Sequence, residues 1–142
     1  HISTDLLEKL IKDKENITIL NNQIIKKIDN LENLENQYIK INVLLGKTLD
    51  VNIINTKIFD RNDLKNLFMS KKIYRVNSKI IISDKHLEQL TKIIKFMPDE
   101  FSIKDFKDKS NLSRKYVVPY LELLDKIGVT QKIDKAGTRK RL

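Results

Sequence analysis

The chain has 142 residues, of which 40% are hydrophobic and 33% charged, with only 3 glycines and 2 prolines. This composition excludes a disordered chain, because it carries enough apolar side chains for a core and few residues that break helices. The formal net charge of +9 favours a polyanion or an acidic surface as the partner.

The absence of cysteine removes disulfides and thiolate metal sites, and it is typical of a reducing compartment, so we expect a cytoplasmic protein. The longest apolar runs have only a few residues, far below the roughly 20 that a membrane span needs. The sequence begins at His1 without an initiator methionine or a signal-peptide pattern. We therefore expect no membrane contact, and a sequence that is a piece of a longer chain.

The first predicted elements are a helix marked by Leu7 and Leu10 and then a short hairpin. In residues 17–25, isoleucines flank two asparagines, which indicates strand, two-residue turn and strand. Residues 73–81 repeat this pattern at an offset of 56 positions, and a third copy begins at Val129. The hairpin is therefore predicted to recur three times.

Helical patterns recur at the same offset. One apolar stripe consists of Leu31, Leu34, Tyr38 and Ile41, and its copy consists of Leu87, Leu90, Ile94 and Met97. Further helices precede the second and third hairpins, at Leu64 to Leu67 and at Leu121 to Leu124. In the last copy, a short strand near residues 101–103 and a small helix over 104–110 lie between the first helix and the helix that precedes the hairpin. Three helices and a two-stranded wing are the order of a winged-helix domain, a relative of the helix-turn-helix.

We accordingly predict a mostly α-helical α+β fold, with small β-hairpin wings, built from tandem winged-helix domains. Residues 1–28 would be the last helix and wing of a truncated domain. Residues 29–84 would form one complete domain, and residues 85–142 a second.

The last long helix is predicted to begin at Ser113, as its N-cap, and to end at Gly128. Its apolar face comprises Val117, Tyr120, Leu121, Leu124 and Ile127. Arg114 and Lys115 stand at its start, where the helix dipole is already positive. A phosphate backbone would compensate this excess of positive charge. Pro119 inside the pattern is expected to bend the helix.

The surroundings of this helix start are basic too. Residues 104–142 hold 11 basic and 5 acidic residues, a net charge of +6. Around Arg114 and Lys115, the set predicted to face a nucleic acid also includes Ser113 as the cap, Lys104, Lys107 and Lys109 on the small helix, and Arg139, Lys140 and Arg141 on the last strand. Together they would form a contiguous basic face; a merely solvated basic tail is the alternative. Tyr116 could stack on a base, but packing against a neighbouring helix is the favoured interpretation.

The segment FSIKDFKDKSNLSRKYVVPYLELLDKIGVTQKIDKAGTRKRL, residues 101–142, resembles the C-terminal winged-helix domain of the bacterial selenocysteine-specific elongation factor SelB. The shared pattern is F…DFKD…SRKY…P…LE…LDKIGVT followed by a short basic strand. Residues 29–84 resemble the family only through the repeat. Because that family ends in four winged-helix modules, the resemblance implies the end of the second, the third (29–84) and the fourth (85–142).

The resemblance also implies a function. The family's last domain binds the selenocysteine insertion (SECIS) hairpin of mRNA, which directs selenocysteine incorporation at UGA codons. Arg114 and Lys115 would then face the hairpin loop and its phosphates. In the wing this sequence has Lys132 and Ile133, where relatives are often richer in arginine. The ribosome, selenocysteinyl-tRNA, GTP and Mg would be bound through the full-length protein, and we expect a monomer.

No catalytic site is predicted. The 3 glycines do not form a phosphate-binding loop, so the fragment is not expected to hydrolyse GTP. With His1 and His86 as the only histidines, neither a metal site nor a catalytic triad is expected. The alternative function is a DNA-binding winged-helix transcriptional regulator, whose helix enters the major groove. A third hypothesis makes residues 29–84 a spacer, because their recognition helix starts with DRND, where Asp60 is the cap and Asp63 dilutes Arg61.

Overall fold

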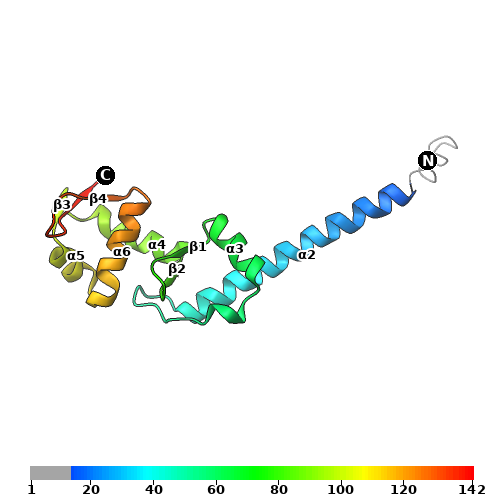
Figure 1. Ribbon diagram of the computed structural model, residues 1–142, viewed down its shortest axis with the longest axis horizontal. Coiled ribbons are helices and arrows are strands. Elements are labelled where there is room, and N and C mark those ends of the chain that lie inside the picture. The colour runs from blue at the N-terminus through cyan, green and yellow to red at the C-terminus, as the bar shows by residue number, and fades with distance from the viewer. Residues whose placement is uncertain (1–13) are drawn as a thin grey trace. The chain divides into compact units, whose positions relative to one another are not determined.

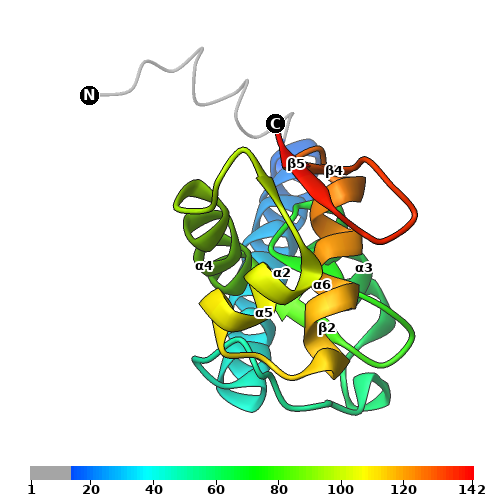
Figure 2. The same cartoon turned by 90° about the vertical axis from the view of Figure 1, so that its left-hand side faces the viewer.

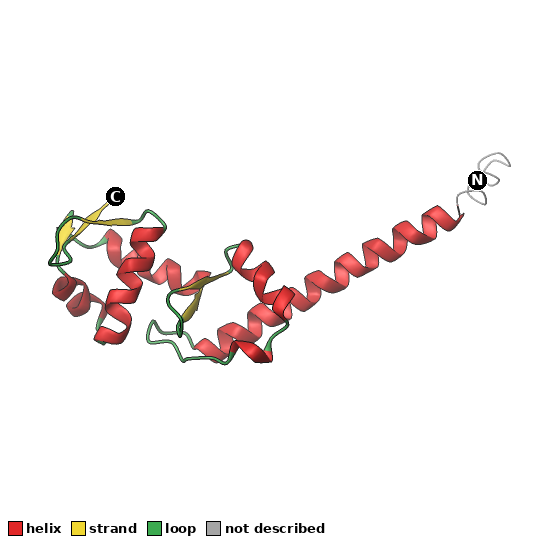
Figure 3. Cartoon of the chain, viewed as in Figure 1, coloured by secondary structure: helices red, strands yellow, loops and turns green. Residues whose placement is uncertain are grey.

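The computed structural model describes residues 14–142, and in the first helix it describes side chains at residues 21–25 and from 33 onward. By its internal contacts the chain divides into two units, His1–Asn36 and Gln37–Leu142. Eleven elements follow one another in the described part (Figures 1 and 3): α2 (Lys14–Leu45), the 3-10 helix η1 (Thr56–Ile58), α3 (Arg61–Met69), β1 (Ile73–Arg75), β2 (Ile81–Ser83), α4 (Asp84–Lys95), β3 (Glu100–Phe101), α5 (Ile103–Ser110), α6 (Arg114–Lys126), β4 (Thr130–Lys132) and β5 (Arg139–Arg141).

The hairpin predicted for residues 17–25 is wrong, because these residues lie inside helix α2. Ile17, Leu20 and Ile24 are spaced by three and four positions, which is the period of a helix. The two asparagines between them lack the glycine that favours a tight hairpin turn. The preceding helix, predicted at Leu7 and Leu10, falls outside the described residues.

The end of α2, helix α3 and the hairpin β1–β2 form the first winged module within residues 37–142. Strands β1 and β2 pair antiparallel, with Ile73 opposite Ser83. The buried side chains of the module include Ile41, Leu45, Leu67, Ile73 and Ile82. Asp60 caps α3 as predicted, because its side chain accepts hydrogen bonds from two amides of the first turn.

Helix α4 is joined to the end of α2 through the buried side chain of His86, which is 1% exposed. The Ser83 amide donates to His86 Nδ1 at 3.1 Å, and Nε2 lies 2.7 Å from the Gly46 carbonyl oxygen. Because an amide can only donate, Nδ1 is the acceptor and Nε2 carries the proton that reaches Gly46. Burial lowers the pKa of His86 below its ordinary value, so the ring is neutral.

A second bond connects the same elements near the surface. The Tyr38 hydroxyl donates to Asp84, whose other carboxylate oxygen lies 3.9 Å from Lys72 Nζ. Burial and the neighbouring Asp84 carboxylate raise the pKa of Tyr38 to about 12. The hydroxyl is therefore a permanent donor at neutral pH, and this bond adds to the junction between α2 and α4.

The second winged module consists of α4, α5 and α6 with a three-stranded antiparallel sheet in the order β3-β5-β4. Helix α5 packs against α6, and the hairpin β4–β5 extends from the end of α6 (Figure 2). The core includes Leu90, Phe101, Phe106, Leu121 and Leu124. The predicted short strand, small helix and third hairpin of this part of the chain are thus all confirmed.

Candidate nucleic-acid interface

Helix α6 begins as predicted at Ser113, but its hydroxyl makes no capping hydrogen bond. Arg114 and Lys115 are exposed, and the first turn holds no acidic residue. The first amides of a helix have no partner within the helix, so they add to the positive potential of the two side chains. The start of α6 therefore presents a hydroxyl, free amides and two cations to solvent.

The first half of α6 is held on the segment that follows α2. Tyr116 is 9% exposed, and its hydroxyl donates to the Val51 carbonyl oxygen at 2.8 Å. One turn later Tyr120 donates to the Leu49 carbonyl oxygen. The two rings pack against each other with centroids 5.8 Å apart. Tyr116 therefore packs, as favoured from the sequence, and its face is not free to stack on a base.

Four of the five residues predicted for the apolar face of α6 are buried, while Ile127 is 39% exposed. Leu123 is buried as well, together with Tyr116. The helix remains continuous through Pro119, which has no amide to donate to the Lys115 carbonyl. Only the start of α6 and a few positions such as Glu122 and Lys126 remain exposed along it.

Helix α5 carries Lys104, Lys107 and Lys109, all exposed. Its start is closed by reciprocal hydrogen bonds between Ser102 and Asp105. The bonds from Ser102 lower the pKa of Asp105, whose carboxylate is thereby kept for the helix cap. None of the three lysines takes part in an ion pair among the described side chains, and they lie next to the turn that leads into α6.

Arg139 does not belong to the exposed basic face predicted from the sequence. Its side chain is 3% exposed, and Nη2 and Nε lie 3.1 and 3.2 Å from Asp125 Oδ2. Nη1 donates to the Gly137 carbonyl oxygen at 2.7 Å, and Thr130 donates to the other oxygen of Asp125. Because β5 is the central strand, Arg139 points into the module and holds the wing on α6.

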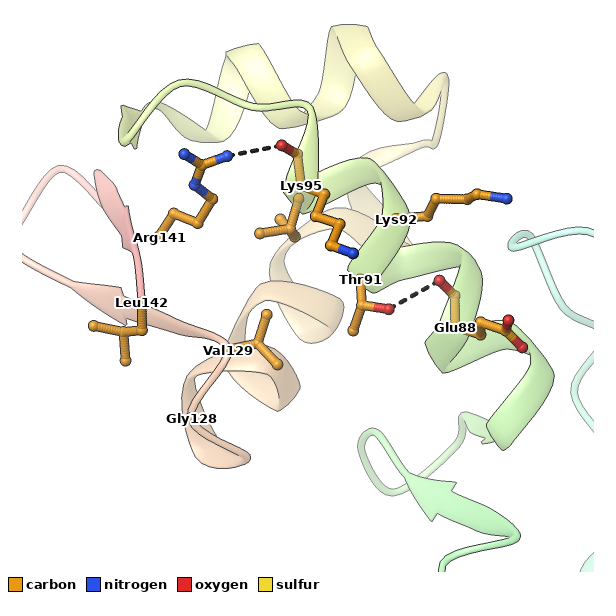
Figure 4. Close-up of a pocket in the computed structure, with 9 residues that line it drawn as sticks. Glu88, Thr91, Lys92, Lys95, Gly128, Val129, Arg141 and Leu142 are labelled. Carbon is orange, nitrogen blue, oxygen red and sulfur yellow. Dashed lines mark hydrogen bonds between the residues drawn. The ribbon is translucent and has the colours of Figure 1, made fainter.

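Arg141 is held by its own module as well (Figure 4). Nη1 donates to the Lys95 carbonyl oxygen at 2.7 Å, and Nη2 lies 2.8 Å from Asp99 Oδ1. Arg141 lines an open pocket of about 580 Å³ with Lys92 and Gly128. Gly128 follows the end of α6, which lies about 20 Å from its start by the rise of a 13-residue helix. Arg141 is therefore not contiguous with Arg114.

Lys140 lies between the two arginines on β5 and points to the opposite side of the sheet, where it is exposed. Its partners across the strands are Gln131 and Glu100. Lys132 and Lys135 of the wing are exposed too, although they were not in the predicted set. Because side chains alternate along a strand, the sequence pattern could have predicted that Arg139 and Lys140 point to opposite sides of the sheet. A count of charges could not.

Three helices followed by a wing, with an exposed basic start on the third helix, define a winged-helix protein of α+β class. Residues 92–136 match a family model described as "Elongation factor SelB, winged helix". The resemblance of the C-terminal part of the chain to SelB winged-helix domains is thereby confirmed.

A solved structure leads to the same fold. The crystal structure of a bacterial selenocysteine-specific elongation factor, EF-Sec, superposes with a TM-score of 0.62 at 24% sequence identity. The match covers 82% of this chain and 19% of that chain, so the present chain corresponds to a small part of the larger protein. No curated protein matches the chain in sequence. Within residues 14–142, no helix combines the length and the hydropathy that crossing a bilayer requires.

Proposed function

We propose that the chain is the C-terminal part of a selenocysteine-specific translation elongation factor and that its last winged-helix domain binds the SECIS hairpin of mRNA. Residues 29–84 would be the third and residues 85–142 the fourth winged-helix domain of that protein. The full-length protein would carry the GTPase and act in the cytoplasm with the ribosome and selenocysteinyl-tRNA. The full-length protein would direct the incorporation of selenocysteine at UGA codons.

The observation that carries the proposal is the start of α6. Arg114 and Lys115 are exposed on a turn without acidic residues, and the Ser113 hydroxyl is not used as a cap. Tyr116 and Tyr120 fix this turn to the segment at residues 49–51. A preorganised positive site loses little conformational freedom when it binds an anion.

The chemistry of the two cations suits the loop of an RNA hairpin. Sequence in RNA is usually read at unstacked bases, which a guanidinium can stack on and hydrogen-bond at their edges. Arg114 has that planar group, whereas Lys115 provides a point charge for phosphates. The proposed contact set therefore comprises Ser113, Arg114 and Lys115, flanked by Lys104, Lys107 and Lys109. Lys140 is proposed as a separate contact on the wing, where it is exposed. The two arginines of β5 are left out because their guanidinium groups are bound within the module.

The test compares a SECIS hairpin with a hairpin of equal length whose loop is scrambled, at two salt concentrations. We expect the native loop to bind more tightly and to keep its advantage as salt rises, because base contacts are less sensitive to salt than phosphate contacts. Arg114→Ala should remove most of that advantage. Lys126→Ala, at the other end of α6, is the matched control and should leave it unchanged.

Two outcomes would contradict the proposal. Equal affinity for both loops, lost together at high salt, would reduce the site to a non-specific basic patch. Preference for a DNA duplex over both hairpins would favour a DNA-binding regulator instead.

A further inference from the structure

A groove lies between the end of helix α2 and the start of helix α4, and no residue of the proposed hairpin site lines it. Its volume is about 570 Å³. Positions 38, 39, 42 and 43 of α2 form one wall, and positions 85, 86 and 89 of α4 form the other. We call this space the α2–α4 groove. We propose that it is a docking site for a protein partner that contributes an acidic amphipathic helix.

The wall on α2 carries an exposed apolar stripe. Ile39 and Val43 are four positions apart, so they follow one another along one side of the helix. Val43 is 75% exposed and Ile39 is 53% exposed, whereas Ile41 and Leu45 of the same helix are buried in the module. A single exposed apolar side chain is ordinary, but two neighbours beside a concave space indicate an interaction site.

The polar side chains that line the groove are already bonded within the protein. The Tyr38 hydroxyl donates to Asp84, and Asn42 Nδ2 donates to the Tyr38 carbonyl oxygen at 3.1 Å. Gln89 Nε2 donates to the Lys47 carbonyl oxygen at 2.9 Å. The groove therefore favours a ligand that fills it with apolar side chains over a ligand held by hydrogen bonds.

The groove is formed before any partner arrives. The buried His86 ring of α4 bonds to the Gly46 carbonyl oxygen, which directly follows α2, and to the Ser83 amide. The bond from Gln89 to Lys47 joins the same two segments one turn further along α4. Since these bonds fix the two walls relative to each other, docking costs little conformational freedom of the groove itself.

The rim of the groove is positive. Lys47 follows the end of α2 and Lys85 lies in the first turn of α4, and both are exposed. Neither lysine takes part in an ion pair among the described side chains. None of the residues that line the groove is acidic, and the neighbouring Asp84 is bonded to Tyr38 and lies 3.9 Å from Lys72. Carboxylates beside an apolar stripe would complement this rim.

A helix suits these walls. An amphipathic helix that lies in a groove inserts apolar residues at i, i+4 and i+7, and its flanking residues then face the rim. Leucines in such a stripe would cover Ile39 and Val43, while glutamates on the flanks would reach Lys47 and Lys85. A nucleic-acid backbone would satisfy only the lysines and would leave the two apolar side chains exposed to water.

The test uses a dye-labelled helical peptide with leucines at i, i+4 and i+7 and glutamates on both flanks, titrated with the full chain of 142 residues. We expect an increase in fluorescence anisotropy that saturates. A peptide with lysines in place of the glutamates, and another with alanines in place of the leucines, should each bind at least about tenfold more weakly. Absence of binding up to millimolar peptide would overturn the proposal.

Two double variants locate the peptide. Ile39→Ala/Val43→Ala should lower the affinity at least about tenfold, because the apolar stripe is removed. Lys47→Gln/Lys85→Gln should lower it by about threefold or more, and this loss should shrink as salt rises. All four side chains are exposed, so the fold should persist, and circular dichroism verifies this.

The matched controls change exposed residues that do not line the groove. Ile58→Ala/Met69→Ala replaces apolar side chains that are 54% and 71% exposed, and Lys126→Gln/Lys132→Gln removes two cations. Both controls should retain the affinity. Equal losses in the groove variants and their controls would overturn the proposal, because composition and net charge alone would then explain binding.

Other occupants of the groove give different results. Arg114→Ala should leave the peptide affinity unchanged, and a large loss would assign the peptide to the start of α6 instead. Displacement of the peptide by an RNA hairpin, with affinity for that hairpin lowered by Lys47→Gln/Lys85→Gln, would make a nucleic acid the occupant. Dimers in sedimentation experiments that Ile39→Ala/Val43→Ala abolishes would make a second copy the occupant. Each of these three results would overturn the proposal and leave the proposed hairpin function to its own test.

Discussion

The Tyr116 hydroxyl donates a hydrogen bond to the Val51 carbonyl oxygen, 65 positions earlier in the chain, at 2.8 Å. This bond joins the first winged module to the helix that carries the proposed hairpin site. With the bond from Tyr120 to Leu49, it fixes both the place and the rotation of the first two turns of α6. The site therefore depends on residues outside the C-terminal module.

Replacing these tyrosines tests that dependence without changing charge. Tyr116→Phe should lower the free energy of unfolding by about 1 to 2 kcal/mol, because the buried Val51 carbonyl loses its partner. Hairpin affinity should fall although Arg114 and Lys115 remain. Denaturant titration and hairpin binding provide the two measurements. Tyr74→Phe, at a half-exposed tyrosine of β1, is the control and should alter neither quantity.

Arg139→Ala should act on stability. The substitution leaves Asp125 without its cation and the Gly137 carbonyl without a donor. We therefore expect the free energy of unfolding to fall by about 2 to 3 kcal/mol. This is less than the usual cost of breaking a fully buried ion pair, because Asp125 is partly exposed. Lys140→Ala, one residue further along β5, should change stability by less than about 0.5 kcal/mol. Thermal unfolding of the two variants separates them, and similar midpoints would show that the ion pair contributes little.

Gly137→Ala should destabilise the wing more than Gly128→Ala. Both glycines have positive φ, +97° and +84°, so each substitution carries a backbone cost of about 1 kcal/mol. A Cβ at Gly137 would also overlap Ile103 Cδ1 and lie 3.2 Å from Arg139 Nη1, whereas Gly128 has nothing within 4 Å. Overpacking adds about 1 to 3 kcal/mol at Gly137 alone. Equal unfolding midpoints would contradict this reading of the wing.

Stability should decrease as the pH falls from about 7 to 5. The pKa of His86 is lowered by burial in the folded state, so the unfolded chain, with an ordinary value of 6.5, binds the proton first. The contribution of His86 is therefore complete above pH 6.5 and is lost below it, by at most about 1.4 kcal/mol per pH unit. Denaturant titrations across this range measure the slope. His86→Gln should flatten it, and an unchanged slope would assign it to other groups.

How far the sequence predicts the structure differs between elements. Helices α4 and α6 were predictable because their apolar residues recur at the spacing of a helix. The role of Asp60 as the cap of α3 was predictable because capping depends only on neighbouring residues. Residues 17–25 failed because their isoleucines suit a strand while their spacing also suits a helix. The preference of isoleucine for strands favoured a hairpin at residues 17–25, whereas the spacing of the apolar residues favoured a helix, and the structure has the helix.

The basic face shows a second kind of limit. A count of charges treats Arg139 and Lys140 alike, although neighbouring residues of a strand point to opposite sides. That Arg139 meets Asp125 depends on β5 occupying the middle of the sheet, which no local pattern reveals.

The tyrosine contact also provides the chain with an optical reporter. The sequence has four tyrosines and no tryptophan, and two of the four tyrosines are Tyr116 and Tyr120, buried in the joint between the modules. Their intrinsic fluorescence is not masked by an indole, so it should change when this joint opens, without an attached dye. Recorded while a hairpin is titrated, it would reveal whether RNA bound at the start of α6 is sensed at residues 49–51.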